Sequence, residues 1–146
     1  MNNHNITNLL WADDDSKLML KPLQWGLVRG GFRIKEVGSY AEAIDVLDNG
    51  PVTFESLLVD TILPRATPGT SHPFTGLSLA EYAAKKKGIQ CIAFLSVVAH
   101  TEVIEKYNSM KTNFPNVRFH YANKLMLLEP YAIEQLIESL KPPTSR

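Results

Sequence analysis

The sequence predicts an α/β domain in which helices cover both faces of one parallel sheet. Short apolar runs alternate with stretches whose apolar residues recur at helical spacing, as in consecutive βαβ units. Four of these runs end in a chemically useful residue or pair: Asp13-Asp14, Asp60, Ser96 and Lys124. The carboxyl ends of parallel strands lie along one edge of a sheet, where ligands bind in such folds. We therefore expect carboxylates, a hydroxyl and an amine to meet at that edge.

Three strands and two helices are expected in the first half of the chain. A strand over 9–12 leads to a helix that carries apolar residues from 18 to 28, with Asp15 or Ser16 as its cap and Gly30-Gly31 at its end. A strand over 32–37 then precedes a helix over 40–47, which Ser39 can cap. The third strand covers 55–60. Both tryptophans, Trp11 and Trp25, are expected to pack in the core.

The second half begins with a loop and supplies the last two strands. Residues 64–76 contain three prolines and two glycines, which oppose both helix formation and strand pairing, so a loop is expected beside Asp60. The elements expected after this loop are a helix over 77–87, a strand over 90–96, a helix over 100–111 and a strand over 117–122. Glu129-Pro130 opens the last helix, because proline is tolerated in a first turn, and Pro142-Pro143 ends it.

The composition describes an ordinary globular chain. Its 146 residues suffice for one domain with its own core, so we expect residues 1–146 to form a single domain with a core at about 8–140 and no output domain. Lys plus Arg and Asp plus Glu both number 15, which favours neither nucleic acid nor a membrane as a partner. The start of the chain lacks a signal-peptide pattern, and the single Cys91 allows no internal disulfide. These features predict a cytoplasmic protein.

The acidic residues at the ends of the first and third strands suggest a divalent cation. Neighbouring carboxylates repel one another in a partly dry site unless a cation offsets their charge. Asp13, Asp14 and Asp60 offer hard oxygen ligands, which favour Mg²⁺ or Mn²⁺. The alternative is that the acidic residues of the first strand end only cap the following helix and favour its positive end.

Asp60 is a candidate acceptor of a phosphoryl group. A carboxylate can act as a nucleophile and carry that group as an aspartyl phosphate. Lys124 and the metal would neutralise charge on the transferring group, and the Ser96 hydroxyl can donate a hydrogen bond to one of its oxygens. Taken alone, Ser96 is also typical of a strand-end turn, and Lys124 of a solvated surface charge.

In this order and spacing, the strand-end residues resemble those of the receiver domain of two-component response regulators, the chemotaxis-regulator type of flavodoxin-like fold. The resemblance covers about residues 8–140. It rests on the acidic pair, on Asp60 followed by Pro64 in a D-x-x-x-P pattern, and on the strand-end serine and lysine. It implies a doubly wound parallel sheet of five strands in the order 2-1-3-4-5, with five helices in one three-layer domain.

The resemblance also implies a set of metal ligands and an acceptor. Asp60 resembles the phospho-acceptor, and Asp14 resembles the carboxylate that contacts Mg²⁺ directly. Asp13 corresponds to a carboxylate that acts largely through water. Ile62 stands at the position whose backbone carbonyl completes the metal site, so its side chain need not be polar.

The remaining site residues correspond to a switch. Ser96 resembles the hydroxyl that turns toward the phosphoryl group, Lys124 the amine that pairs with it, and Tyr121 an aromatic residue that changes rotamer on activation. The family implies a histidine kinase or phosphotransfer protein as phosphodonor, a downstream protein partner, and compatibility with a homodimer. It implies no enzyme activity beyond self-catalysed phosphotransfer and dephosphorylation.

Three departures from the family pattern keep other functions open. The family usually has proline after its lysine and a small residue after its switch hydroxyl, whereas Leu125 and Val97 stand here. The segment 65–74 is also longer than usual, and we expect it to cover the site or mark a partner surface unless it is a passive insertion. One alternative is a receiver-fold binding module with impaired phosphorylation. Another is a haloacid-dehalogenase-like phosphohydrolase with its covalent intermediate on Asp13.

Overall fold

A computed structural model describes residues 6–14, 21–66, 71–72, 74–97 and 100–143. Its main sheet has five parallel strands in the order β2-β1-β3-β6-β7. These strands are β1 (Thr7–Ala12), β2 (Phe32–Val37), β3 (Ser56–Asp60), β6 (Cys91–Ser96) and β7 (Arg118–Asn123). Numbered within the sheet alone, this order is 2-1-3-4-5, which confirms the expected doubly wound topology.

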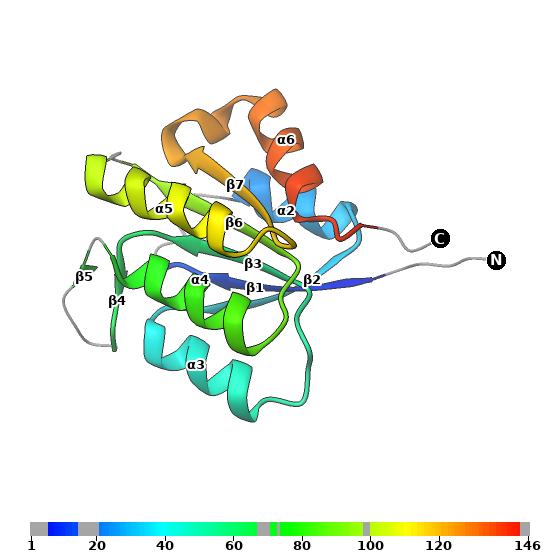
Figure 1. Ribbon diagram of the computed structural model, residues 1–146. Helices are drawn as coiled ribbons and strands as arrows, with labels where there is room; N and C mark the ends of the chain where they lie inside the picture. The colour runs from blue at the N-terminus through cyan, green and yellow to red at the C-terminus, as the bar shows by residue number, and fades with distance from the viewer. Residues whose placement is uncertain (1–5, 15–20, 67–70, 73, 98–99, 144–146) are drawn as a thin grey trace.

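Helices cover both faces of the sheet and complete a three-layer domain (Figure 1). One face carries α3 (Tyr40–Asn49), α4 (Thr75–Lys86) and α5 (Thr101–Asn113), and the opposite face carries α2 (Lys21–Arg29) and α6 (Pro130–Leu140). The expected helices are therefore present, with ends shifted by a few residues. No helix in the described part of the chain is long and apolar enough to cross a membrane.

Alternation along the strands divides the core between the two faces. In β1, Leu10 packs with the helices of the α3 face, whereas Leu9 and Trp11 pack beneath α2 and α6. Trp11 is fully buried, as expected, but Trp25 is 61% exposed on α2, so its expected core position is wrong. The buried face of α2 carries Leu23 and Leu27. Trp25 lies two residues from each of them, which places it on the opposite side of the helix.

Local caps and turns explain where several elements begin and end. The Ser39 side chain accepts a hydrogen bond from the Glu42 N–H at 3.1 Å, which confirms it as the cap of α3. Gly31 has φ 92° in the turn between α2 and β2, a conformation that glycine adopts without a steric penalty. The expected cap at Asp15 or Ser16 lies outside the described residues.

The proline-rich segment after Asp60 is not wholly a loop, and this part of the prediction is wrong. Two short strands, β4 (Leu63–Pro64) and β5 (Ser71–His72), pair antiparallel. Directly after β4, the Arg65 carbonyl accepts a hydrogen bond from Ala41 N–H at 2.8 Å. The Arg65 guanidinium also lies 5.2 Å from the centre of the Tyr40 ring. Arg65, at the start of the insertion, thus contacts the first turn of α3.

The connection from β7 to α6 contains a 3₁₀-helix that was not expected. This helix, η1, covers Lys124–Leu128 and begins where the sheet ends. The Asn123 side chain accepts a hydrogen bond from Leu125 N–H at 2.8 Å and so caps η1. Only Leu127 is buried in η1, whereas Leu125, Met126 and Leu128 are exposed.

Candidate functional site

The carboxyl edge of the sheet brings three of the expected charged residues into direct contact. Asp13 follows β1, Asp60 ends β3 and Lys124 begins η1 after β7. The backbone N–H of Asp13 donates to the Val37 carbonyl at 3.0 Å, which continues the β1–β2 ladder by one residue and fixes its carboxylate at the edge. The three side chains therefore come from three different strand ends.

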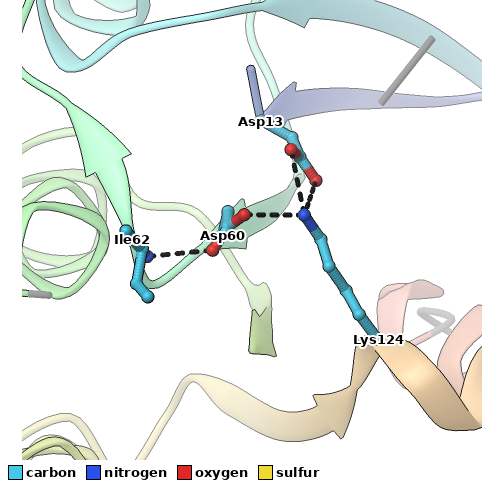
Figure 2. A network of polar contacts seen from close by, with 4 residues as sticks. All are labelled: Asp13, Asp60, Ile62 and Lys124. Atoms are coloured by element: carbon cyan, nitrogen blue, oxygen red, sulfur yellow. Dashed lines mark hydrogen bonds and ion pairs between the residues drawn. The ribbon is translucent and has the colours of Figure 1, made fainter. Parts of the chain in front are cut away.

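Lys124 is the centre of this contact (Figure 2). Its Nζ lies 2.7 Å from Oδ2 of Asp60 and 3.0 Å from Oδ2 of Asp13. The Lys124 and Asp60 side chains are about one tenth exposed, and the Asp13 side chain is fully buried. Two carboxylates thus share one ammonium in a place that is largely closed to water. Such a buried cluster is costly to leave incomplete, because removing one partner exposes the others to unbalanced charge.

The second oxygen of Asp60 faces the opposite side. Its Oδ1 accepts a hydrogen bond from the Ile62 N–H at 2.9 Å. Next to it, Thr61 N–H donates to the Leu95 carbonyl at 2.9 Å, and the Thr61 carbonyl accepts from Gly76 N–H at 3.1 Å. The backbone after Asp60 is therefore held on both sides, which fixes the Asp60 carboxylate between an ammonium and an amide.

Gly76 permits the start of α4 to approach Asp60 closely. A Cβ at this position would lie 2.0 Å from the backbone oxygen of Asp60 and 2.8 Å from Cα of Thr61. Backbone atoms cannot move aside as the end of a flexible side chain can. The glycine after the insertion is thus required by the close packing of α4 on the end of β3.

The acidic residues also fit a divalent cation. Ligand atoms of Asp13, Asp14 and Asp60 all lie within 4.8 Å of one another. Asp14 is exposed and the other two are buried, so the cluster opens toward solvent on one side. A set of carboxylate oxygens suits a hard cation such as Mg²⁺, Mn²⁺ or Ca²⁺. Lys124 already offsets part of the charge of this cluster, and a cation would offset the remainder.

The two expected switch residues lie on neighbouring strands. Ser96 is 2% exposed at the end of β6, one residue beyond the Leu95 that pairs with Asp60. Tyr121 pairs with Phe94 in the sheet, and its ring packs against Tyr107 at a centroid distance of 5.2 Å. Burial raises the pKa of the Tyr107 hydroxyl, with a smaller contribution from Tyr121. The Tyr121 hydroxyl is buried with no hydrogen-bond partner in the described part of the chain.

Two contributions to the site were not found from sequence. The first is the cap that Asn123 places on η1 beside Lys124. The signal was present, because asparagine directly before a helical turn is typical of a cap. The second is the tie between Arg65 and α3, which combines a backbone carbonyl with a guanidinium over the Tyr40 ring and joins residues too far apart in the sequence for a local pattern to reveal.

Comparison with solved structures places this arrangement in a known fold. A CheY-like response regulator receiver domain from Methanospirillum hungatei JF-1 is similar at 20% identity and a TM-score of 0.60, over 92% of this chain and 95% of that one. A signal receiver domain of a modulated diguanylate cyclase from Desulfovibrio desulfuricans G20 is similar at 19% identity and a TM-score of 0.66, over 92% and 90%.

A third similar structure contains a modified acceptor. It is a Burkholderia pseudomallei response regulator with a phosphorylated aspartic acid, a calcium ion and citrate. Its identity is 21% and its TM-score 0.61, over 92% of this chain and 66% of that one. No protein-family model and no curated protein matches the sequence. The sheet order and these similarities together show that the chain has the fold of a response regulator receiver domain.

Proposed function

We propose that this protein is a receiver in a two-component phosphorelay and accepts a phosphoryl group on Asp60. The observation that carries the proposal is the shared ammonium, because Lys124 Nζ contacts Asp60 at 2.7 Å and Asp13 at 3.0 Å. A preorganised cation beside a nucleophilic carboxylate is the arrangement that phosphoryl transfer requires. The receiver fold of the similar structures supports the same function.

The proposed reaction is a single displacement. A carboxylate oxygen of Asp60 attacks the phosphorus of a phosphohistidine, so that an O–P bond forms while the N–P bond breaks. The imidazole leaves with the electron pair and takes up a proton from solvent. Lys124 would pair with the negative charge of the transferred group, and the Ile62 N–H, 2.9 Å from Asp60 Oδ1, would keep the carboxylate oriented.

Asp13, Asp14 and Asp60 would hold Mg²⁺ or Mn²⁺, with the Ile62 carbonyl as a further ligand. When bound, the cation would supply charge neutralisation for the phosphoryl oxygens. The mutual distance of 4.8 Å or less among the carboxylate atoms supports this assignment. The calcium ion named with the similar Burkholderia pseudomallei structure is consistent with a divalent cation at such a site.

Signalling would proceed through changed protein contacts. Ser96 would turn toward the phosphoryl group, and Tyr121 would change its position in the aromatic cluster beside Tyr107. Phosphorylation would thereby shift a two-state equilibrium and alter the surface of α5, β7 and α6. The phosphodonor would be a histidine kinase or phosphotransfer protein in the cytoplasm, and the downstream partner would be another protein. Residues 1–146 would act as one domain.

A binding module without efficient phosphorylation is the second candidate. Val97 is 47% exposed directly after Ser96, where the family prefers a small residue. Its side chain would narrow the approach of a donor to Asp60. Leu125 gives weaker support for this candidate, because the Lys124 ammonium reaches both carboxylates without a following proline.

Labelling with a small phosphodonor separates these candidates. Full-length wild type with Mg²⁺ and acetyl phosphate is expected to gain one phosphoryl group, mapped to Asp60, and Asp60→Asn is expected to gain none. A folded wild type that gains no phosphoryl group would contradict phosphorylation and leave the binding module. A phosphoryl group mapped to Asp13 would instead indicate the haloacid-dehalogenase-like phosphohydrolase.

A further inference from the structure

A capping hydrogen bond joins the two residues on either side of Lys124, the lysine of the candidate site. The Asn123 Oδ1 accepts a hydrogen bond from Leu125 N–H at 2.8 Å, and Lys124 is the one residue between them. The Asn123 backbone is extended, with φ −85° and ψ 124°, so the strand conformation ends there and η1 begins. The contact has the form of a helix cap, in which a short polar side chain satisfies a free amide of the first turn.

This contact stands where the sheet no longer holds the chain. Ser96 and Asn123 form the last pair between β6 and β7. Beyond this pair the chain turns into η1, and the first backbone hydrogen bond past the turns of η1 itself is that from Glu129 N–H to the Met126 carbonyl. Leu125 is 63% exposed, so its packing adds little order. The side chain of Asn123 is therefore a side-chain contact that fixes the backbone on both sides of Lys124 where the strand turns into η1.

The direction of the backbone matters because the lysine side chain is long and its ammonium must contact two carboxylates at once. The Nζ must lie close to Asp60 and Asp13 at once, at 2.7 and 3.0 Å. Ordering a lysine side chain costs about 2 kcal/mol of rotamer entropy. A small rotation at Cα moves the ammonium at the end of the chain away from one carboxylate.

We propose that Asn123 is a positioning residue that aims Lys124 at Asp60 and Asp13. The identity of residue 125 explains both why the hydrogen bond to Asn123 is needed and why it can form. A proline at position 125 would restrict this turn by its ring, but it would have no N–H to donate. Leu125 supplies that N–H, and Asn123 accepts it. The inference rests on the proposed function only where it gives Lys124 a role in phosphoryl transfer.

NMR of the lysine ammonium groups in the full-length, ¹⁵N-lysine-labelled chain tests the positioning itself. An ammonium shared by two buried carboxylates exchanges its protons slowly and gives a cross-peak, which Lys124→Arg identifies by its disappearance. Asn123→Ala and Asn123→Gly are expected to lose this cross-peak, and Asn123→Ser is expected to keep it because serine can also cap. Labelling of Asp60 should slow between about 10- and 100-fold in the first two variants.

Asn116→Ala is the matched control, since Asn116 is exposed in the turn before the same strand. Retention of the wild-type cross-peak in both Asn123→Ala and Asn123→Gly would overturn the proposal, as would its loss in Asn116→Ala. Glycine is tolerated at helix caps, so Asn123→Gly keeps the test valid should the alanine variant not fold. A wild type that gives the cross-peak but no acyl phosphate would contradict the proposed function and leave the positioning role intact.

Discussion

At the scale of single residues, Gly76 shows how closely the end of β3 and the start of α4 are packed. The missing side chain allows the Gly76 N–H to reach the Thr61 carbonyl at 3.1 Å. A methyl group would collide with the backbone oxygen of Asp60, which no rotamer change can relieve. Position 76 therefore needs glycine because of the nearby backbone of Asp60, and not because of the conformation of the preceding turn.

Gly76→Ala is expected to lower the free energy of unfolding by about 2 kcal/mol or more, because overpacking outweighs the gain in helix propensity. Chemical denaturation monitored by circular dichroism measures this change. Gly38→Ala is the matched control, since its Cβ would have ordinary contacts at 3.5 Å or more, and it should change stability by less than about 0.5 kcal/mol. Equal stability of wild type and Gly76→Ala would contradict the close approach.

The site residues were predictable to different degrees for a physical reason. Asp60 and Lys124 could be placed together because parallel register carries both to one edge of the sheet. Asn123 could not be assigned its role, because that role depends on the backbone direction after β7. Trp25 was misplaced because its exposure depends on which side of α2 faces the sheet, and the apolar residues of this helix do not form a single stripe.

At the scale of elements, long periodic segments were predictable and short paired ones were not. The five main strands are either apolar runs or alternate apolar with polar residues, as β2 and β7 do, so their positions follow from local sequence. The strands β4 and β5 have two residues each and exist only because they pair with each other. Pro64 is tolerated there because the ribbon is short and lies apart from the main sheet.

The edge strand β7 carries a group that links stability to pH. His120 is half-buried beside the groove between β7 and α6, where Arg118, Tyr131, Glu134, Gln135, Glu138 and Ser139 also lie. Burial lowers the pKa of His120 below its usual value of about 6.5. The unfolded chain therefore binds a proton at His120 more readily than the folded chain does.

The stability contributed by neutral His120 is expected to be complete above about pH 6.5 and to be lost as the pH falls through the lower pKa of the folded state. Denaturation curves recorded between about pH 7.5 and 5 should show this loss in the wild type. The free energy of unfolding of His120→Gln should depend less on pH over the same range. His100→Gln, at the exposed cap of α5, serves as the control. Identical pH dependence of wild type and His120→Gln would contradict the burial effect.

At the scale of the whole molecule, the carboxyl edge couples the stability of the fold to the candidate metal site. The candidate cation ligands come from the ends of β1 and β3, which lie inside the sheet. Unfolding would separate these ligands, so a cation at this site would bind the folded chain in preference to the unfolded chain. Binding of this kind must raise the free energy of unfolding in proportion to the logarithm of cation concentration above its dissociation constant.

Mg²⁺ at about 100 times its dissociation constant is expected to stabilise the fold by about 2.7 kcal/mol, or about 5 to 10 °C in melting temperature. Thermal unfolding in Mg²⁺ and in EDTA measures this difference.

Asp14→Asn should remove most of the shift while leaving the buried contact of Lys124 with Asp13 and Asp60 in place, because Asp14 is exposed. Glu105→Gln, an exposed acidic residue on α5, should keep the full shift. A melting temperature that is the same in Mg²⁺ and EDTA would contradict the metal site, and a full shift in Asp14→Asn would place the cation elsewhere.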